Sequence, residues 1–237
     1  VNSVQVVSNT QYINEYIQYF YNLGVDPNKV NRVLINQVNF ADSCDFNNVN
    51  IFVVPKFVIS EDRSFPPYVS NSFKNLIIDL TEDKKMISNE VVPRDPVYMA
   101  YGLGYTVGGN LTTSILDNTN LYVVRDTTNK INKNTLKTRV GNLIKEFFLP
   151  ENNKLGQTLN LSTLTSSILS LEGVRRIFTQ NPLTNDQFDG ISFLTFNPLY
   201  PETDIALVNQ DTTLPFFKFP YLYSPLTISN RIIIRDE

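Results

Sequence analysis

Apolar residues recur at helical spacing in four stretches of the chain. In the first of them Tyr12, Tyr16 and Phe20 repeat every four residues, and Gly24 can adopt the backbone conformation that ends a helix. Gly173 follows the last stretch and favours a stop in the same way. The predicted helices are residues 10–23, 70–85, 134–148 and 162–171.

Strand patterns lie between and after these helices. In the clearest one, Val97, Met99 and Tyr101 fall on one face while Ala100 and Gly102 fall on the other, because successive strand residues alternate in direction. The small face can lie close under a helix. The predicted strands are residues 30–40, 50–54, 90–93, 97–107, 174–180 and 190–197.

The order of these elements predicts an α+β fold. Helix-strand-strand units with antiparallel or mixed connections produce small sheets covered by helices. Two such units are expected, the first over residues 1–109 and the second over residues 110–197. Residues 198–237 mix prolines with aromatic residues and show no helical period, so we expect an extended C-terminal arm with short edge strands.

The chain contains no histidine and a single cysteine, Cys44. Histidine is the usual base beside a serine or cysteine nucleophile, so catalytic sites of that kind are excluded within this chain. A structural zinc site built from Cys and His is excluded as well, since it needs four such ligands. An intramolecular disulfide is excluded because it needs two cysteines. We therefore expect no enzyme, no metal and no cofactor; the catalytic alternatives that remain are a carboxylate pair, as in a hydrolase, a lysine of lowered pKa, or a magnesium or calcium cluster.

Charge and hydropathy narrow the possible partners. The net charge is −3, and the lysines and arginines are scattered, which disfavours nucleic-acid binding. No apolar run approaches the roughly 20 residues that a membrane-spanning helix needs. With 42% hydrophobic residues the chain has enough apolar side chains for a substantial core.

Two groups of residues are candidates for a protein interface. Prolines stiffen the aromatic C-terminal segment, so it would lose little entropy on docking, although the segment can equally pack on its own domain. Arg175 and Arg176 are neighbours on a predicted strand, so only one of them can face the core; the alternative is an ordinary charged surface. The aromatic candidates are Phe216, Phe217, Phe219, Tyr221 and Tyr223.

Several segments resemble a known family. Residues 164–178 read LTSSILSLEGVRRIF, and residues 8–38 begin SNTQYINEYIQYFYNLGVD. With NIFVVPK at residues 50–56, their order is similar to that in the baseplate J-like proteins of contractile phage tails, in particular the C-terminal part of the wedge subunit of T4-like phages. Residues 110–133 depart from the family pattern, and the long amino-terminal region of that subunit has no counterpart here.

The resemblance implies a structural role without catalytic residues. It implies contacts with copies of the chain itself and with other baseplate wedge proteins, in a ring within the virion that assembles in the cytoplasm of the host bacterium. No small-molecule substrate, nucleic acid or membrane is expected as a partner. The alternative is a carbohydrate-binding or adhesin module, favoured by the many tyrosines and asparagines and disfavoured by the absence of tryptophan.

Overall fold

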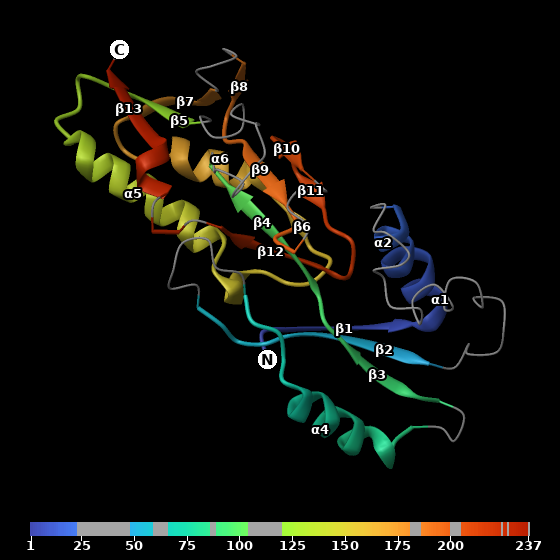
Figure 1. Ribbon diagram of the computed structural model, residues 1–237. Coiled ribbons are helices and arrows are strands. Elements are labelled where there is room, and N and C mark those ends of the chain that lie inside the picture. The colour runs from blue at the N-terminus through green and yellow to red at the C-terminus, as the bar shows by residue number, and fades with distance from the viewer. Residues whose placement is uncertain are drawn as a thin grey trace.

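The chain folds as a mixture of helices and small sheets, shown by the computed structural model in Figure 1. The arrangement is compatible with the predicted α+β class, and the described part contains four sheets with both parallel and antiparallel pairs. The predicted strand over residues 30–40 and Cys44 lie outside the described residues. The structure describes residues 1–22, 48–58, 66–85, 89–103, 120–180, 186–199, 205–223, 225–226 and 228–236.

The first predicted helix is present and runs continuously through three segments. Ser8 begins it, because its hydroxyl accepts a hydrogen bond from the backbone N–H of Gln11 at 3.3 Å. Tyr12 and Ile17 are buried on its inner side, and the ring of Tyr16 stacks on that of Tyr12 at 5.2 Å. The segments are α1 (Asn9–Gln11), the π-helical η1 (Tyr12–Ile17) and α2 (Gln18–Asn22).

An N-terminal layer is built on the three-stranded sheet β1-β2-β3. Strand β1 pairs antiparallel with β2, and β2 pairs parallel with β3. Helix α4, the second predicted helix, packs beside β3 and begins at Ser70, whose hydroxyl accepts from Phe73 N. The first helix and α4 lie on opposite sides of these strands (Figure 1). The bounds are β1 (Ser3–Ser8), β2 (Val49–Val54), β3 (Val91–Arg94) and α4 (Asn71–Glu82).

The central sheet has the order β10-β9-β4-β12, and every residue of β4 and β12 is buried. The strand predicted over residues 97–107 is described as far as Gly102, and residues 104–107 lie outside the described residues. Both faces of β4 are covered. The face with large side chains and the face with small side chains are therefore both packed against other parts of the chain. The bounds are β4 (Val97–Gly102), β9 (Phe193–Phe196), β10 (Ala206–Val208) and β12 (Lys218–Leu222).

A third layer consists of the sheet β13-β5-β7-β8 with the last two predicted helices, α5 and α6, packed on it. Leu136, Val140 and Ile144 of α5 are fully buried, as their helical spacing predicts. Gly173 has a φ of +85°, so the predicted left-handed residue after the last helix is confirmed. The bounds are α5 (Lys133–Phe147), α6 (Leu161–Leu169), β5 (Asn120–Arg125), β7 (Val174–Gln180), β8 (Gln187–Asp189) and β13 (Ile232–Asp236).

Short elements complete the described part of the chain. Strand β6 pairs with β11 as a two-stranded sheet, and two 3₁₀ turns flank α5 and β13. Their bounds are η2 (Pro150–Asn152), β6 (Thr158–Leu159), β11 (Thr212–Thr213) and η3 (Ile228–Arg231).

The three segments predicted from the sequence meet in one sheet. Strand β4 comes from residues 1–109, β9 from residues 110–197, and β10 and β12 from residues 198–237. Strand β12 pairs in parallel with β4, and β13 pairs in parallel with β5, so the C-terminal residues are edge strands of two core sheets. The predicted edge strands of the C-terminal segment are therefore present, and they pair with strands from both of the preceding segments.

One core connects the layers. The ring of Phe148, just after α5, lies 5.3 Å from Tyr101 of β4 and 5.2 Å from Phe193 of β9. All three side chains are at most 3% exposed. Aromatic pairs at this separation contribute about 0.5–1.5 kcal/mol each beyond the area that they bury, so these rings fix α5 against the central sheet.

Candidate functional site

The aromatic residues of the C-terminal segment lie mainly in the core. Phe216, Phe217, Phe219 and Tyr221 are 7% exposed or less, and Tyr223 is half-buried with its ring 4.8 Å from that of Phe196. Pairing of β12 with β4 brings them inside, because both faces of this sheet are covered. The segment thus packs on its own domain, which was the alternative to an interface, and these buried side chains offer little surface to a partner.

Arg175 and Arg176 lie in β7 beside an irregularity in its pairing with β5, where Val124 pairs with Arg176 and Arg125 pairs with Val174. Both are exposed. Arg176 forms an ion pair with Asp189 at 2.6 Å, and its guanidinium lies 5.4 Å from the ring centre of Phe178. Arg176 is therefore already paired, and both arginines line a polar hollow beside α6.

That hollow, of about 900 Å³, is lined by hydroxyl, amide and charged groups around the start of α6. The carboxylate of Asp211 accepts hydrogen bonds from the backbone N–H and the hydroxyl of Ser162, at 2.8 and 2.7 Å. These bonds lower the pKa of Asp211. Asn160, the residue before α6, makes no side-chain capping bond, so Asp211 satisfies this helix end from a distant segment.

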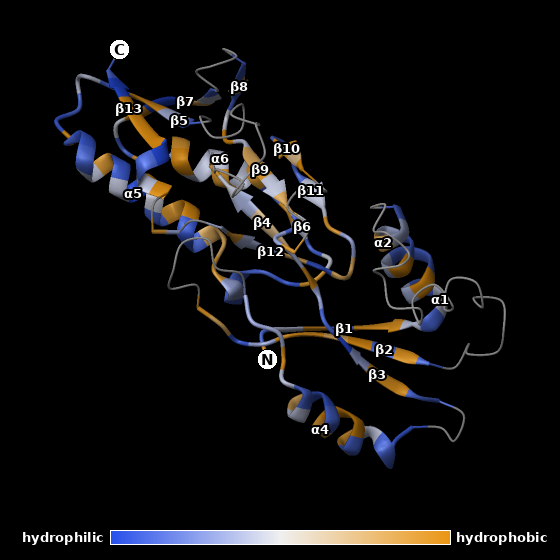
Figure 2. Cartoon of the chain, viewed as in Figure 1, coloured by the Kyte–Doolittle hydropathy of each residue, from blue (hydrophilic) through white to orange (hydrophobic). Residues whose placement is uncertain are grey.

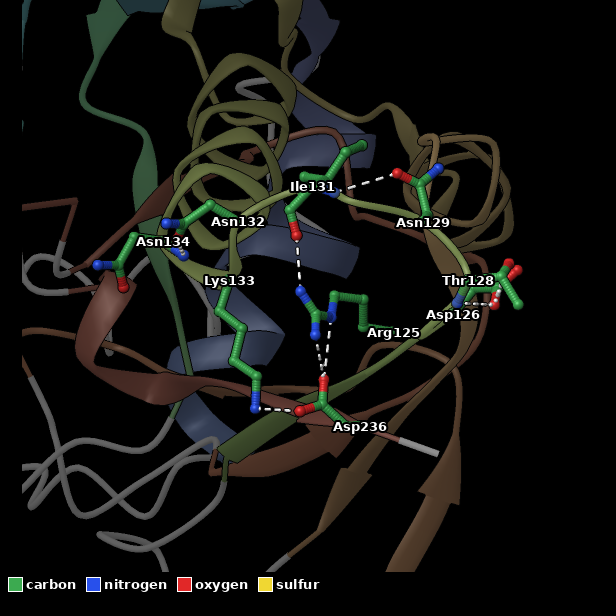
Figure 3. A network of polar contacts seen from close by, with 9 residues as sticks. All are labelled: Arg125, Asp126, Thr128, Asn129, Ile131, Asn132, Lys133, Asn134 and Asp236. Atoms are coloured by element: carbon green, nitrogen blue, oxygen red, sulfur yellow. Dashed lines mark hydrogen bonds and ion pairs between the residues drawn. The ribbon is translucent and has the colours of Figure 1, made fainter.

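A polar network fastens the C-terminal strand (Figure 3). The carboxylate of Asp236 in β13 accepts from Arg125 Nε at 2.9 Å and pairs with Lys133 Nζ at 2.5 Å. Arg125 also donates to the carbonyl of Ile131 at 2.7 Å. Strand β13, strand β5 and the start of α5 are thereby held at one point. The hydrogen bond from Lys133, followed by the charge of Arg125, lowers the pKa of Asp236.

The contribution of this network to the stability of the fold should depend on pH. A carboxyl whose pKa is lower in the folded chain stabilises the fold above its unfolded pKa of about 3.9, and this contribution is lost as the pH falls through the folded value. Asp236→Asn should therefore be less stable than the wild type near about pH 6, and the difference should be smaller near about pH 3, below the unfolded pKa. Urea unfolding at both values checks this; a difference that does not change with pH would contradict it.

Exposed apolar side chains gather in the N-terminal layer. Val4 and Val6 of β1 are 51% and 55% exposed, and Leu76 and Leu80 of α4 are 47% and 64% exposed. No residue of α4 is buried, although the helix carries apolar and polar residues on different sides (Figure 2). The apolar stripe predicted for residues 70–85 is present, and the rest of the described chain covers only part of it.

An apolar groove of about 700 Å³ opens at the C-terminal end of α5. Its exposed apolar side chains are Val58, Leu149 and Leu226, and Phe148 lies beneath them. The groove also carries two lysines and one glutamate, namely Lys56, Lys145 and Glu151. We refer to it below as the lysine groove. No sequence signal marks it, because its residues come from segments far apart in the chain.

The described residues contain no group of three carboxylates or thiols placed to hold a metal ion. Asp189 is the ion-pair partner of Arg176. Within the described ranges, no helix combines the length and apolar character needed to cross a membrane.

Comparison of the chain with models of known protein families gives no match, and comparison with curated proteins gives none either.

Proposed function

We propose that the chain is a non-enzymatic structural subunit of a phage tail baseplate, which holds copies of itself and neighbouring wedge proteins in a ring. The observation that carries the assembly role is the group of exposed apolar side chains on β1 and α4 of the N-terminal layer. Exposed apolar side chains that gather in one part of a surface are a feature of interaction sites.

The proposed location in the baseplate rests on the order of the sequence segments, which is similar to that in the baseplate J-like proteins. The chain would accordingly act in the virion. The absence of histidine from the sequence removes the commonest general base and supports a non-catalytic role. A gene located beside genes for other tail proteins is the expected context, whereas a gene among unrelated functions would contradict the baseplate assignment.

The adhesin alternative receives less support from the described surface. Glycan sites typically offer exposed aromatic faces, and in the described ranges Tyr21 is the one aromatic side chain among the strongly exposed large hydrophobic residues. The other members of that group are aliphatic. An aliphatic surface suits contact with another protein better than contact with a sugar ring.

Substitutions in the N-terminal layer should weaken self-association without unfolding the chain. Val4→Ser with Val6→Ser, or Leu76→Ser with Leu80→Ser, removes apolar area that is already exposed, so the fold should keep its stability. We expect association at least about tenfold weaker, which corresponds to about 1.4 kcal/mol. Sedimentation velocity measures this.

A matched control replaces aliphatic residues elsewhere on the surface. Leu169→Ser with Leu207→Ser alters side chains that are 41% and 40% exposed and lie outside the N-terminal layer. Association of this variant should equal that of the wild type. Equal weakening by the control and by the layer variants would contradict an interface in this layer.

A further inference from the structure

Helix α4 presents an acidic-apolar stripe that the described chain leaves open. Leu76 and Leu80 are one turn apart, and Asp79 and Asp83 each follow one of them by three residues. At 3.6 residues per turn these four side chains project from one side of the helix. All four are exposed, and neither aspartate forms an ion pair with a described residue.

The lysine groove is complementary to this stripe, because it combines accessible apolar walls with positively charged side chains. Val58 is 87% exposed, Leu226 60% and Leu149 39%, so its apolar walls are accessible. Lys56 is exposed and Lys145 half-buried, and neither forms an ion pair within the described residues. The two lysines exceed the single carboxylate of the groove by one positive charge.

We infer that the acidic-apolar stripe of α4 in one copy docks into the lysine groove of a second copy. Leu76 and Leu80 would enter between the apolar walls, and Asp79 and Asp83 would meet Lys56 and Lys145. The groove volume of about 700 Å³ lies in the range of about 300–1,000 Å³ that is typical of binding pockets, and an amphipathic helix in an apolar groove is a common mode of recognition. This inference rests on the proposed assembly function.

The two surfaces are different parts of the molecule, so the contact is head-to-tail. Such a contact leaves one free stripe and one free groove in every pair of copies, and a further copy can add at either end. Repeated addition closes into a ring if the rotation between copies permits, and otherwise produces a filament. A ring is the form that the proposed function requires.

Complementation between two defective variants of the full chain tests the contact. The first variant, Leu76→Ser with Leu80→Ser, lacks the stripe; the second, Lys56→Glu with Lys145→Glu, lacks the groove charges. Each alone should associate at least about tenfold more weakly than the wild type. An equimolar mixture should form dimers of one copy of each and nothing larger, because the dimer retains only a defective groove and a defective stripe at its ends.

Charge reversal gives a second, independent readout. Asp79→Lys with Asp83→Lys, mixed with the Lys56→Glu, Lys145→Glu variant, should restore binding to within about threefold of the wild type. Lys56→Glu alone serves if the change at half-buried Lys145 disturbs α5. Circular dichroism confirms that each variant is folded.

The outcomes separate this inference from the proposed function. A wild type that associates while the Lys56→Glu, Lys145→Glu variant associates equally well, or whose variants fail to complement, would overturn the contact between stripe and groove alone. A wild type that remains monomeric would overturn the assembly function itself.

Discussion

Phe217→Ala is expected to destabilise the chain by about 3–5 kcal/mol, the usual loss when a buried phenylalanine is truncated. The side chain is 1% exposed, and its ring lies 5.2 Å from both Tyr16 and Tyr19 of the first helix. The substitution thus removes the ring that joins this helix to the segment leading into β12. Thermal unfolding should shift down by roughly 6–20 °C, since 1 kcal/mol corresponds to about 2–4 °C at this chain length.

Tyr21→Ala is the matched control for Phe217. Tyr21 lies on the helix against which Phe217 packs but is 67% exposed, so its removal should change stability by less than about 0.5 kcal/mol. An unchanged melting temperature for Phe217→Ala would contradict a core position and would return this residue to the candidates for a protein interface.

Gly156→Ala should cost about 1–3 kcal/mol for the backbone conformation alone. Gly156 has a φ of +66°, and an added Cβ would lie 2.9 Å from the Cα of Phe216. A backbone atom cannot move aside as the end of a flexible side chain can, so the segment that leads into β12 must shift. Chemical denaturation measures the loss in the free energy of unfolding.

Gly141→Ala, in contrast, is not expected to lower the free energy of unfolding. Gly141 lies within α5, and an added Cβ would meet Ser229 Oγ at 3.4 Å, which is close to ordinary contact. Alanine is favoured over glycine in a helix by about 1 kcal/mol. This variant should match or exceed the wild type in stability; equal destabilisation of both glycine variants would show that the strain at Gly156 has no special effect.

Local patterns were sufficient to predict the helices and several strands. The spacing of Tyr12, Tyr16 and Phe20 reflects one buried side of a helix, and this property depends only on neighbouring residues. Val97, Met99 and the residues between them likewise show the period of a strand. These elements are where the sequence places them because their burial follows from short-range geometry.

The pairing of distant strands could not be predicted in this way. Prolines such as Pro220 favoured edge strands, and β12 lies at the edge of the central sheet, where the missing N–H of a proline is tolerated. Its partner Met99 is far away in the sequence, and no local pattern indicates their parallel register. The same long-range contact buries the C-terminal aromatics that their composition had suggested as an interface.

The candidate surfaces also differ in how far local sequence patterns predict them. The amphipathic character of α4 was visible in the sequence, but the incomplete burial of Leu76 and Leu80 depends on what packs around the helix. The lysine groove depends entirely on tertiary structure, since Lys56 and Lys145 share no local pattern. Arg175 and Arg176 are both exposed, and the irregular pairing of β7 with β5 at this point does not follow from the alternation of strand residues.

Sedimentation velocity of the wild-type chain over a range of concentrations tests the assembly claim most directly. From about 1 µM to about 200 µM, which spans contacts of micromolar affinity, the average mass should rise well above the 27.1 kDa of one copy. The rise should be smaller at high salt if lysine-carboxylate pairs contribute to the contact. A single species of 27.1 kDa at every concentration would contradict self-assembly.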